Sequence, residues 1–276
     1  MTTAYNFERD LLFKCRDRRL NRIVLPLADG TIQLPGTSRY ESVSYLIFEL
    51  AKGDIRAEVE SWKSFDIAWV LRSLHHTANG LSQLHSAGIA HQDLKPSNVL
   101  VYPSEGSKIA DLGRASYIHK SSSVDSFQIP GDYGYAPPEQ WYGWHHSQDF
   151  NERYVADLYH LGSLLYFYFA KVSATSAIRT KIIRRQPSFT KTIFTQDLPY
   201  LQQAFNETLE DLEAIIKPLA GALTSEMIMI AKQLCQPDPR MRGDPNAHTP
   251  GRSQHDVQAY ISRFDRLATK AEMRIL

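Results

Sequence analysis

Apolar residues recur every three to four positions along much of this chain, which is the spacing of one face of an α-helix. Residues 6–19 show the pattern at Phe7, Leu11 and Leu12, and residues 67–84 repeat it. The same spacing predicts further helices over residues 54–62, 155–170, 198–219, 223–235 and 253–271.

Short runs of β-branched and aromatic residues predict strands near the N-terminus. Residues 23–27 and 31–34 form one candidate pair, with Ala28-Asp29-Gly30 as the predicted turn, and residues 42–50 form a third run. Farther along, residues 99–101 and 108–110 are spaced as a hairpin-like pair. Because helices follow a small strand-bearing start, the predicted fold class is α+β.

The composition of the 276-residue chain is that of an ordinary globular protein, with 43% hydrophobic and 22% charged residues. The formal net charge of +1 gives no field that would draw the protein to nucleic acid or acidic membranes. Cys15 and Cys235 are too few for a disulfide framework, so we expect two buried thiols in a reducing compartment. The first residues lack a basic start and an apolar run, and the apolar residues 158–172 are too short to span a bilayer. These features predict a soluble, cytoplasmic protein with neither a nucleic-acid nor a membrane partner.

Two carboxylates, an amide and a lysine lie on two short loops that flank the hairpin-like strands: Asp93, Lys95, Asn98 and Asp111. Asp93 is a candidate proton acceptor for an attacking hydroxyl. Lys95 offers a positive charge to a transferring phosphoryl group. Asn98 and Asp111 supply the hard oxygen ligands that a phosphate-bound magnesium ion requires. The grouping predicts transfer of a phosphoryl group from Mg-bound ATP to a hydroxyl.

These loops resemble those of the eukaryotic-type protein kinases, whose catalytic and metal-binding loops follow the patterns H-R-D-L-x-x-x-N and D-F-G. Three further elements of that family follow in the expected order: an A-P-E-like element, a D-x-x-x-x-G helix start and a late D-P-x-x-R. The matching residues are His91-Gln92-Asp93-Leu94-Lys95-Pro96-Ser97-Asn98, Asp111-Leu112-Gly113, Tyr135-Ala136-Pro137-Pro138-Glu139, Asp157-Leu158-Tyr159-His160-Leu161-Gly162 and Asp238-Pro239-Arg240-Met241-Arg242.

The resemblance implies a two-lobed kinase fold, with a truncated small lobe over residues 1–51 and a mainly helical large lobe over residues 52–276. It also implies transfer of the γ-phosphoryl of ATP, with Mg2+, to Ser or Thr hydroxyls of a protein substrate. The backbone of Glu49 to Ala51 would be the hinge that binds adenine, and Phe48 would guard the back of the nucleotide pocket.

Three structural roles are also implied by the resemblance. Glu8 would be the ion-pairing glutamate of the regulatory helix. Asp157 would accept backbone N–H groups of the catalytic loop. Glu139 would form a buried pair with Arg242, or with Arg240 instead.

Two departures from the family pattern bear on mechanism. Gln92 replaces the arginine that in many kinases meets a phosphate on the activation segment, so switching by phosphorylation there is not expected. Asp132 stands where Ser/Thr kinases usually carry threonine, and its carboxylate would compete for Lys95. A basic stretch over residues 171–196 is interpreted as a solvated loop plus helix, or as a docking surface for a protein.

Two parts of a complete kinase are missing from the sequence: a Gly-rich loop over the phosphates and the lysine that pairs with the helix glutamate. Only seven residues precede Glu8, whereas three strands and their turns need roughly 30 to 40 residues. The chain is therefore part of a longer kinase, or a second polypeptide completes the small lobe, or the protein is a pseudokinase that acts as a non-catalytic scaffold. A phosphotransferase of the aminoglycoside type also uses an H-x-D loop, but such enzymes generally lack the A-P-E element and the late arginine.

Overall fold

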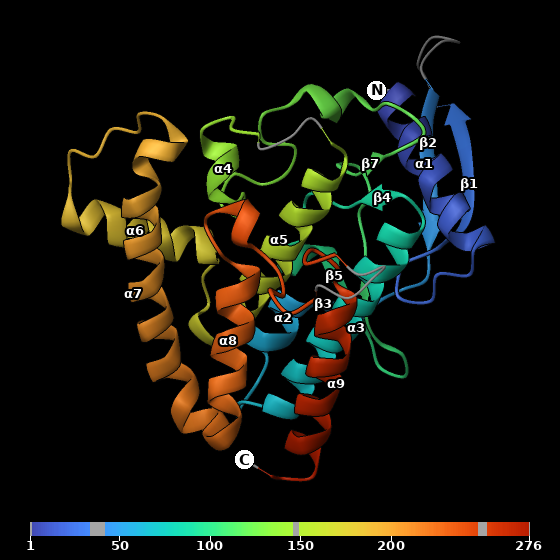
Figure 1. The fold of residues 1–276 in the computed structure, drawn as a ribbon. Helices are drawn as coiled ribbons and strands as arrows, with labels where there is room; N and C mark the ends of the chain where they lie inside the picture. The colour runs from blue at the N-terminus through green and yellow to red at the C-terminus, as the bar shows by residue number, and fades with distance from the viewer. Residues whose placement is uncertain (1, 34–41, 146–148, 248–252, 276) are drawn as a thin grey trace.

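The computed structural model describes residues 2–33, 42–145, 149–247 and 253–275. At one end, helix α1 (Thr2–Asp17) packs on an antiparallel ribbon of β1 (Pro26–Gln33) and β2 (Ser42–Phe48), and the helical body lies on the other side of α1 (Figure 1). The predicted α+β class with a small strand-bearing part and a mainly helical part is confirmed. The proposed boundary between residues 51 and 52 stays a prediction.

The predicted turn at Ala28-Asp29-Gly30 is wrong, because these residues lie inside β1 and pair with Tyr45 to Ile47 of β2. A β-bulge between Pro26 and Ala28 starts the regular pairing. A Cβ on Gly30 would lie 2.4 Å from the Tyr45 hydroxyl, so the glycine makes room for a ring that crosses it. Tertiary pairing therefore overrides the local turn preference. Leu34, the end of the predicted second strand, lies outside the described residues.

The helical part begins with β3 (Gly53–Asp54) and α2 (Ile55–Glu60), where the Asp54 side chain accepts the Ala57 N–H and caps the helix. Asp66 caps α3 (Ile67–Ser86) in the same way through the Trp69 N–H. The remaining strands are β4 (Ile89–Ala90), β5 (Val99–Tyr102), β6 (Gly106–Ile109) and β7 (Ser116–Tyr117). The remaining helices are α4 (Pro138–Trp141), α5 (Asn151–Ala170), α6 (Ala174–Arg185), α7 (Phe194–Ala220), α8 (Thr224–Leu234) and α9 (Gln258–Glu272). The predicted helices are confirmed, with ends shifted by a few residues.

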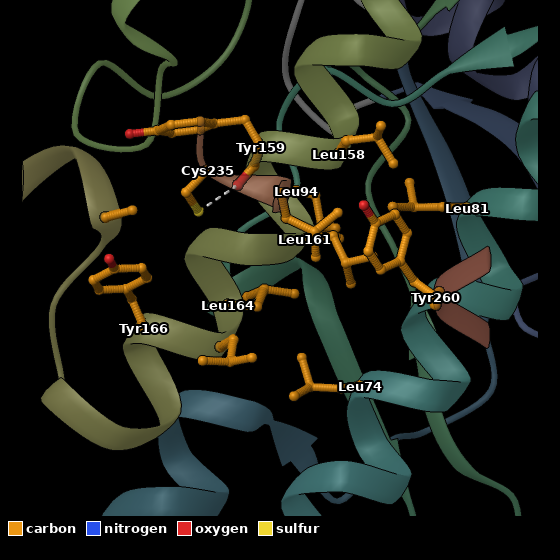
Figure 2. Close-up of a cluster of buried hydrophobic side chains, with 14 of the residues drawn as sticks. Leu74, Leu81, Leu94, Leu158, Tyr159, Leu161, Leu164, Tyr166, Cys235 and Tyr260 are labelled. Atoms are coloured by element: carbon orange, nitrogen blue, oxygen red, sulfur yellow. Dashed lines mark hydrogen bonds between the residues drawn. The ribbon is translucent and has the colours of Figure 1, made fainter. Parts of the chain in front are cut away.

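The core is built around α5, in which every side chain from Val155 to Phe169 is buried. Figure 2 shows Leu158, Leu161 and Leu164 of α5 in one cluster with leucines of α3 and Tyr260 of α9. A helix that is buried on every side lies in the middle of a large domain. It is therefore a rigid support for the loops that contact it.

Both thiols are buried, as predicted. Burial raises the pKa of the Cys15 thiol to about 12, which outweighs the nearby charges of Arg18 and Lys14. The Cys235 Sγ lies 3.7 Å from the backbone oxygen of Tyr159 (Figure 2). At neutral pH both groups are protonated and act as small apolar side chains.

The helical stretch Phe194–Leu234 is the one stretch of the described chain that is long and apolar enough to cross a membrane. It consists of α7 and α8, which are separated at Gly221 and pack against each other. Core helices of globular domains pass the same test, so the stretch is weak evidence for a membrane span.

Candidate active site

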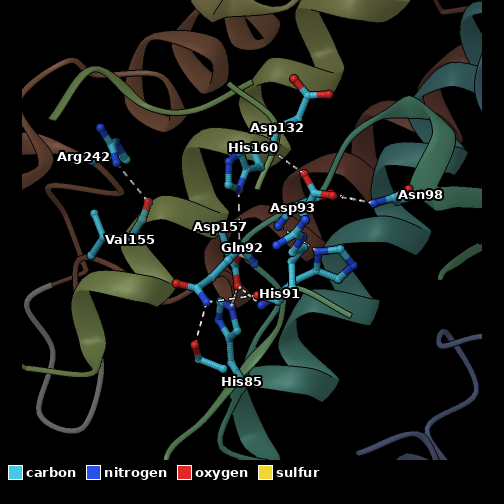
Figure 3. Close-up of polar contacts among 12 residues, drawn as sticks. His85, His91, Gln92, Asp93, Asn98, Asp132, Val155, Asp157, His160 and Arg242 are labelled. Atoms are coloured by element: carbon cyan, nitrogen blue, oxygen red, sulfur yellow. Dashed lines mark hydrogen bonds and ion pairs between the residues drawn. The ribbon is translucent and has the colours of Figure 1, made fainter. Parts of the chain in front are cut away.

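The loop from His91 to Asn98 is held by a carboxylate of the central helix. Asp157 accepts the N–H of His91 at 2.8 Å and that of Gln92 at 2.7 Å, and its Oδ2 lies 2.8 Å from His85 Nε2 (Figure 3). Burial raises the pKa of Asp157, but the nearby imidazoles of His160, at 3.8 Å, and His85, at 2.8 Å, outweigh it and hold the pKa below its ordinary value. Asp157 thus has the backbone-anchoring role that the sequence predicted.

Gln92 and Asp111 both adopt a left-handed backbone with φ of 62°. Non-glycine residues in this region cost about 1 kcal/mol or more and persist only where the surroundings hold them. The Asp157 carboxylate provides that hold at Gln92.

Asp93 is 5% exposed and its carboxylate is surrounded by donors. Its Oδ1 accepts the Asp132 N–H at 2.7 Å, and its Oδ2 accepts Asn98 Nδ2 at 3.2 Å (Figure 3). The Lys95 Nζ lies 3.1 Å from the same Oδ2. A carboxylate so held is fixed in orientation, as a general base must be.

Lys95 lies between two carboxylates, 3.1 Å from Asp93 and 3.4 Å from Asp132. Burial lowers its pKa, but the charge of Asp93 and then that of Asp132 outweigh burial and raise the pKa above its ordinary value. The ammonium therefore stays charged at neutral pH. The predicted competition of Asp132 for Lys95 is present in the structure.

The Asp111 loop is tied to the Asp93 loop through the residue before it. The Ala110 N–H donates to the backbone oxygen of Asn98 at 2.9 Å, and the Ala110 backbone oxygen accepts a hydrogen bond from His91 Nε2 at 3.0 Å. Asp111 itself is exposed, and its Oδ1 accepts the Gly113 N–H at 3.1 Å. The two loops thus bring the predicted oxygen ligands Asn98 and Asp111 to adjoining positions.

These oxygens fit a magnesium ion that is shared with phosphates. In the described part of the chain, no cluster of three or more His, Cys, Asp or Glu residues could hold a metal by itself. Magnesium is usually bound by one or two protein oxygens together with substrate phosphates and waters. An exposed carboxylate beside an amide oxygen is a donor set of that kind.

Glu8 of α1 lies against the Asp111 loop, where a Cβ on Gly113 would be 3.4 Å from its Oε2. Burial raises the pKa of Glu8, the charge of Asp111 adds to the rise, and a hydrogen bond from the Leu112 N–H opposes it. Among the residues described, no lysine or arginine forms an ion pair with Glu8, and its ion-pairing role stays a prediction.

The predicted hinge follows β2. Phe48 is 37% exposed, and Leu50 is 92% exposed. The Glu49 backbone oxygen accepts the Tyr102 hydroxyl at 3.3 Å, and the Lys52 N–H donates to the Val101 oxygen at 2.9 Å. The sequence did not indicate this role of Tyr102, whose hydroxyl binds the Glu49 backbone oxygen within the hinge that was expected to bind adenine. The roles of Glu49 and Ala51 stay predictions.

Glu139 and Arg242 form the predicted buried pair, at 2.7 Å and 2.8 Å. Arg242 is fully buried and also donates to the backbone oxygens of Gln236 and Val155. The alternative with Arg240 is wrong, because Arg240 pairs with Asp238 at 2.7 Å instead. The A-P-E-like element is thereby fastened to the C-terminal helices.

Sequence reasoning missed a polar network beside Gln92. The Gln92 Nε2 donates to Ser116 Oγ at 2.6 Å, and Ser116 in turn donates to the Asp125 carboxylate. Arg153 Nη1 lies 2.5 Å from Asp125 Oδ1. The one signal in the sequence was Gln92, a neutral residue where many kinases carry arginine. Because that positive charge is missing, another cation has to pair with the acidic residue of this segment. Here Arg153 balances a carboxylate of the chain itself.

The comparisons with known proteins agree with this geometry. Residues 28–248 match the family model described as the protein kinase domain. A probable serine/threonine-protein kinase pknA2 of Bifidobacterium longum is 28% identical over 109 residues, which is 39% of this chain and 14% of the relative. The serine/threonine-protein kinase PknA of Mycobacterium tuberculosis is 29% identical over 138 residues, 50% of this chain and 30% of the relative. The serine/threonine-protein kinase par-4 of Caenorhabditis elegans is 29% identical over 188 residues, 63% of this chain and 30% of the relative.

The matches thus cover less than a third of each of these three relatives. The family model covers most of this chain, from β1 to beyond the Arg242 contact with Glu139. The chain therefore belongs to the protein kinase domain family.

Proposed function

We propose that this protein transfers the γ-phosphoryl group of Mg-ATP to Ser or Thr hydroxyls of a protein substrate. The observation that supports the proposal most directly is the convergence of Lys95 and Asn98 on one oxygen of Asp93. The hydrogen bond between Ala110 and Asn98 brings Asp111 beside them. A site that has lost its chemistry would have little reason to keep Lys95 and Asn98 on the Asp93 carboxylate and the Asp111 loop bonded to the Asn98 backbone.

Each residue has a separate task in this proposal. Asp93 orients the substrate hydroxyl and takes its proton, and the fixed donors around its carboxylate keep that oxygen directed. Lys95 places a permanent positive charge next to the transferring group. Asn98 and Asp111 would hold magnesium, which when bound neutralises charge on the phosphates. Glu49 and Ala51 would contact adenine through their backbone.

One observation favours the alternative of a non-catalytic, protein-binding pseudokinase. Glu8 reaches the Asp111 loop without a basic partner in the described residues, and burial and the charge of Asp111 raise its pKa with no positive charge there to oppose them. A lysine from a preceding segment, or from a second polypeptide that completes the small lobe, would supply that charge. We further propose that the small lobe ends near residue 51, and that the protein acts in the cytoplasm without nucleic-acid or membrane partners.

The test is transfer of labelled phosphate from ATP to a mixed protein substrate in the presence of Mg2+. The active-kinase proposal predicts that the wild-type chain incorporates labelled phosphate into the substrate and that Asp111→Asn does not. The fold of this variant, measured without ATP, should be the same as that of wild type. Asp149→Asn, at an exposed acidic residue outside the site, is the matched control and should retain incorporation. Equal, background-level incorporation by all three proteins would refute catalysis by this chain and favour the pseudokinase.

A further inference from the structure

The segment from Gly131 to Tyr135 lies directly against the Asp93 loop. The Asp132 N–H donates to Asp93 Oδ1 at 2.7 Å. A Cβ on Gly131 would lie 2.4 Å from the Gln92 backbone oxygen, so only glycine permits this close approach. A polypeptide that brings a hydroxyl to Asp93 must therefore pass along this segment.

Arg179 of α6 lies over one exposed residue of the segment. Its guanidinium carbon is 4.8 Å from the centre of the Tyr133 ring, which is 54% exposed. The position of α6 is fixed, because Ser173 Oγ donates to the Gly134 oxygen at 2.6 Å and Thr175 Oγ1 to the Ala136 oxygen at 2.9 Å. A guanidinium that stacks on a ring keeps its edge N–H groups available for an anion.

Arg56 of α2 lies at the other tyrosine of the segment. Arg56 is exposed, and its charge acts on the phenol of Tyr135. Burial raises the pKa of that phenol, and Arg56 opposes the rise without cancelling it. Two arginines from different helices thus flank the same short segment next to Asp93.

Neither arginine forms an ion pair with an acidic residue in the described part of the chain. Other cations nearby do: Lys52 pairs with Glu58, Lys181 with Asp211, and Arg185 with Glu207. The acidic residue of the segment, Asp132, is already 3.4 Å from Lys95. The charges of Arg56 and Arg179 are therefore available to a bound polypeptide.

We propose that Arg56 and Arg179 select protein substrates with Asp or Glu side chains close to the acceptor hydroxyl. This inference rests on the proposed function, because it names the substrate class of the same site. Arginine binds carboxylates through paired N–H groups, and its planar side chain loses little freedom when it is already stacked. The carboxylate of Asp132 opposes this only in part, since Lys95 lies 3.4 Å from it.

The experiment measures binding of fluorescent serine peptides to the full chain by anisotropy, without ATP, so that it does not depend on catalysis. Three peptides of equal length carry acidic, neutral or basic residues around one serine. We expect the acidic peptide to bind about tenfold more tightly than the neutral one at low salt, and the preference to shrink as salt screens the charges.

Charge reversal provides the decisive comparison. The double variant Arg56→Glu/Arg179→Glu should lose the acidic preference and favour the basic peptide. Arg184→Glu, at an exposed position on the same helix α6, is the matched control and should bind like wild type. Equal binding of the three peptides to wild type would overturn the proposal, as would a loss in Arg184→Glu equal to that of the double variant. If the acidic preference holds but no phosphate is transferred, only the proposed catalysis fails.

Discussion

The buried pair of Glu139 and Arg242 offers the sharpest quantitative test of the fold. Arg242 is fully buried and makes two short hydrogen bonds to Glu139, with further bonds to two backbone oxygens. Glu139→Gln is nearly isosteric, but it leaves the guanidinium buried without its counter-charge. Breaking one partner of such a pair typically costs about 3–5 kcal/mol. We expect a loss of that size in the free energy of unfolding.

Urea unfolding followed by tryptophan fluorescence and by circular dichroism measures the loss, and coincident transitions establish that it is cooperative. With a urea dependence of about 3 kcal/mol/M for a chain of this size, the midpoint should fall by about 1–1.7 M. Arg240→Met is the matched control, because it breaks the neighbouring pair with Asp238, whose arginine is 43% exposed, and it should cost clearly less than Glu139→Gln.

A double-mutant cycle separates the pair from its surroundings. Removing both charges, in Glu139→Leu/Arg242→Met, should cost clearly less than the sum of the single changes, because no lone charge stays buried. The reasoning is refuted if Glu139→Gln shifts the midpoint no more than Arg240→Met, or if the two single losses simply add.

Three other contacts lead to predictions of their own. Gly131→Ala should weaken phosphoryl transfer at least tenfold with little change in melting temperature, because the new Cβ must push residues 131–135 away from Asp93. Full activity in a transfer assay would contradict the predicted clash. Burial, with the charges of Arg22, His75 and Arg72, lowers the pKa of His76 to about 3, so between about pH 6.5 and 3 the unfolded chain binds a proton that the folded chain does not. Stability should therefore fall as the pH drops through that range, and urea titrations of His76→Gln should show a shallower fall. Asp125→Asn should loosen the Ser116 network and raise the rate of proteolytic cleavage near residue 120, and an unchanged rate would count against a role for Arg153 in holding it.

Much of the fold can be predicted from the sequence because its signals are local. The helical periods of α3 and α5 depend only on their own sequences, and the Asp93 and Asp111 loops flank a short hairpin-like pair of strands. The spacing of the phosphoryl-transfer candidates along the chain is therefore enough to place them near one another. Their catalytic roles stay predictions.

The features that the sequence did not reveal depend on distant partners. Gly30 resembles a turn residue until the Tyr45 ring is seen to cross it, and the carbonyl of Glu49 resembles a free hinge acceptor until Tyr102 is placed beside it. The Ser116, Asp125 and Arg153 network joins two segments that no periodicity relates. In each case a contact between separate elements outweighed the local preference.

The placement of Glu8 shows how packing and chemistry are linked in this chain. The exposed contacts of α1, such as Asp10 with Lys120 at 3.0 Å, contribute at most about 1 kcal/mol each. Burial of Leu11 and Leu12 contributes about 1.5–3 kcal/mol for each side chain, so the apolar face fixes the helix. Glu8 is three and four residues before these leucines, and their burial therefore carries its carboxylate to the Asp111 loop whether or not a cation is there to meet it. A lysine that reached this carboxylate would oppose the burial and the Asp111 charge that raise its pKa.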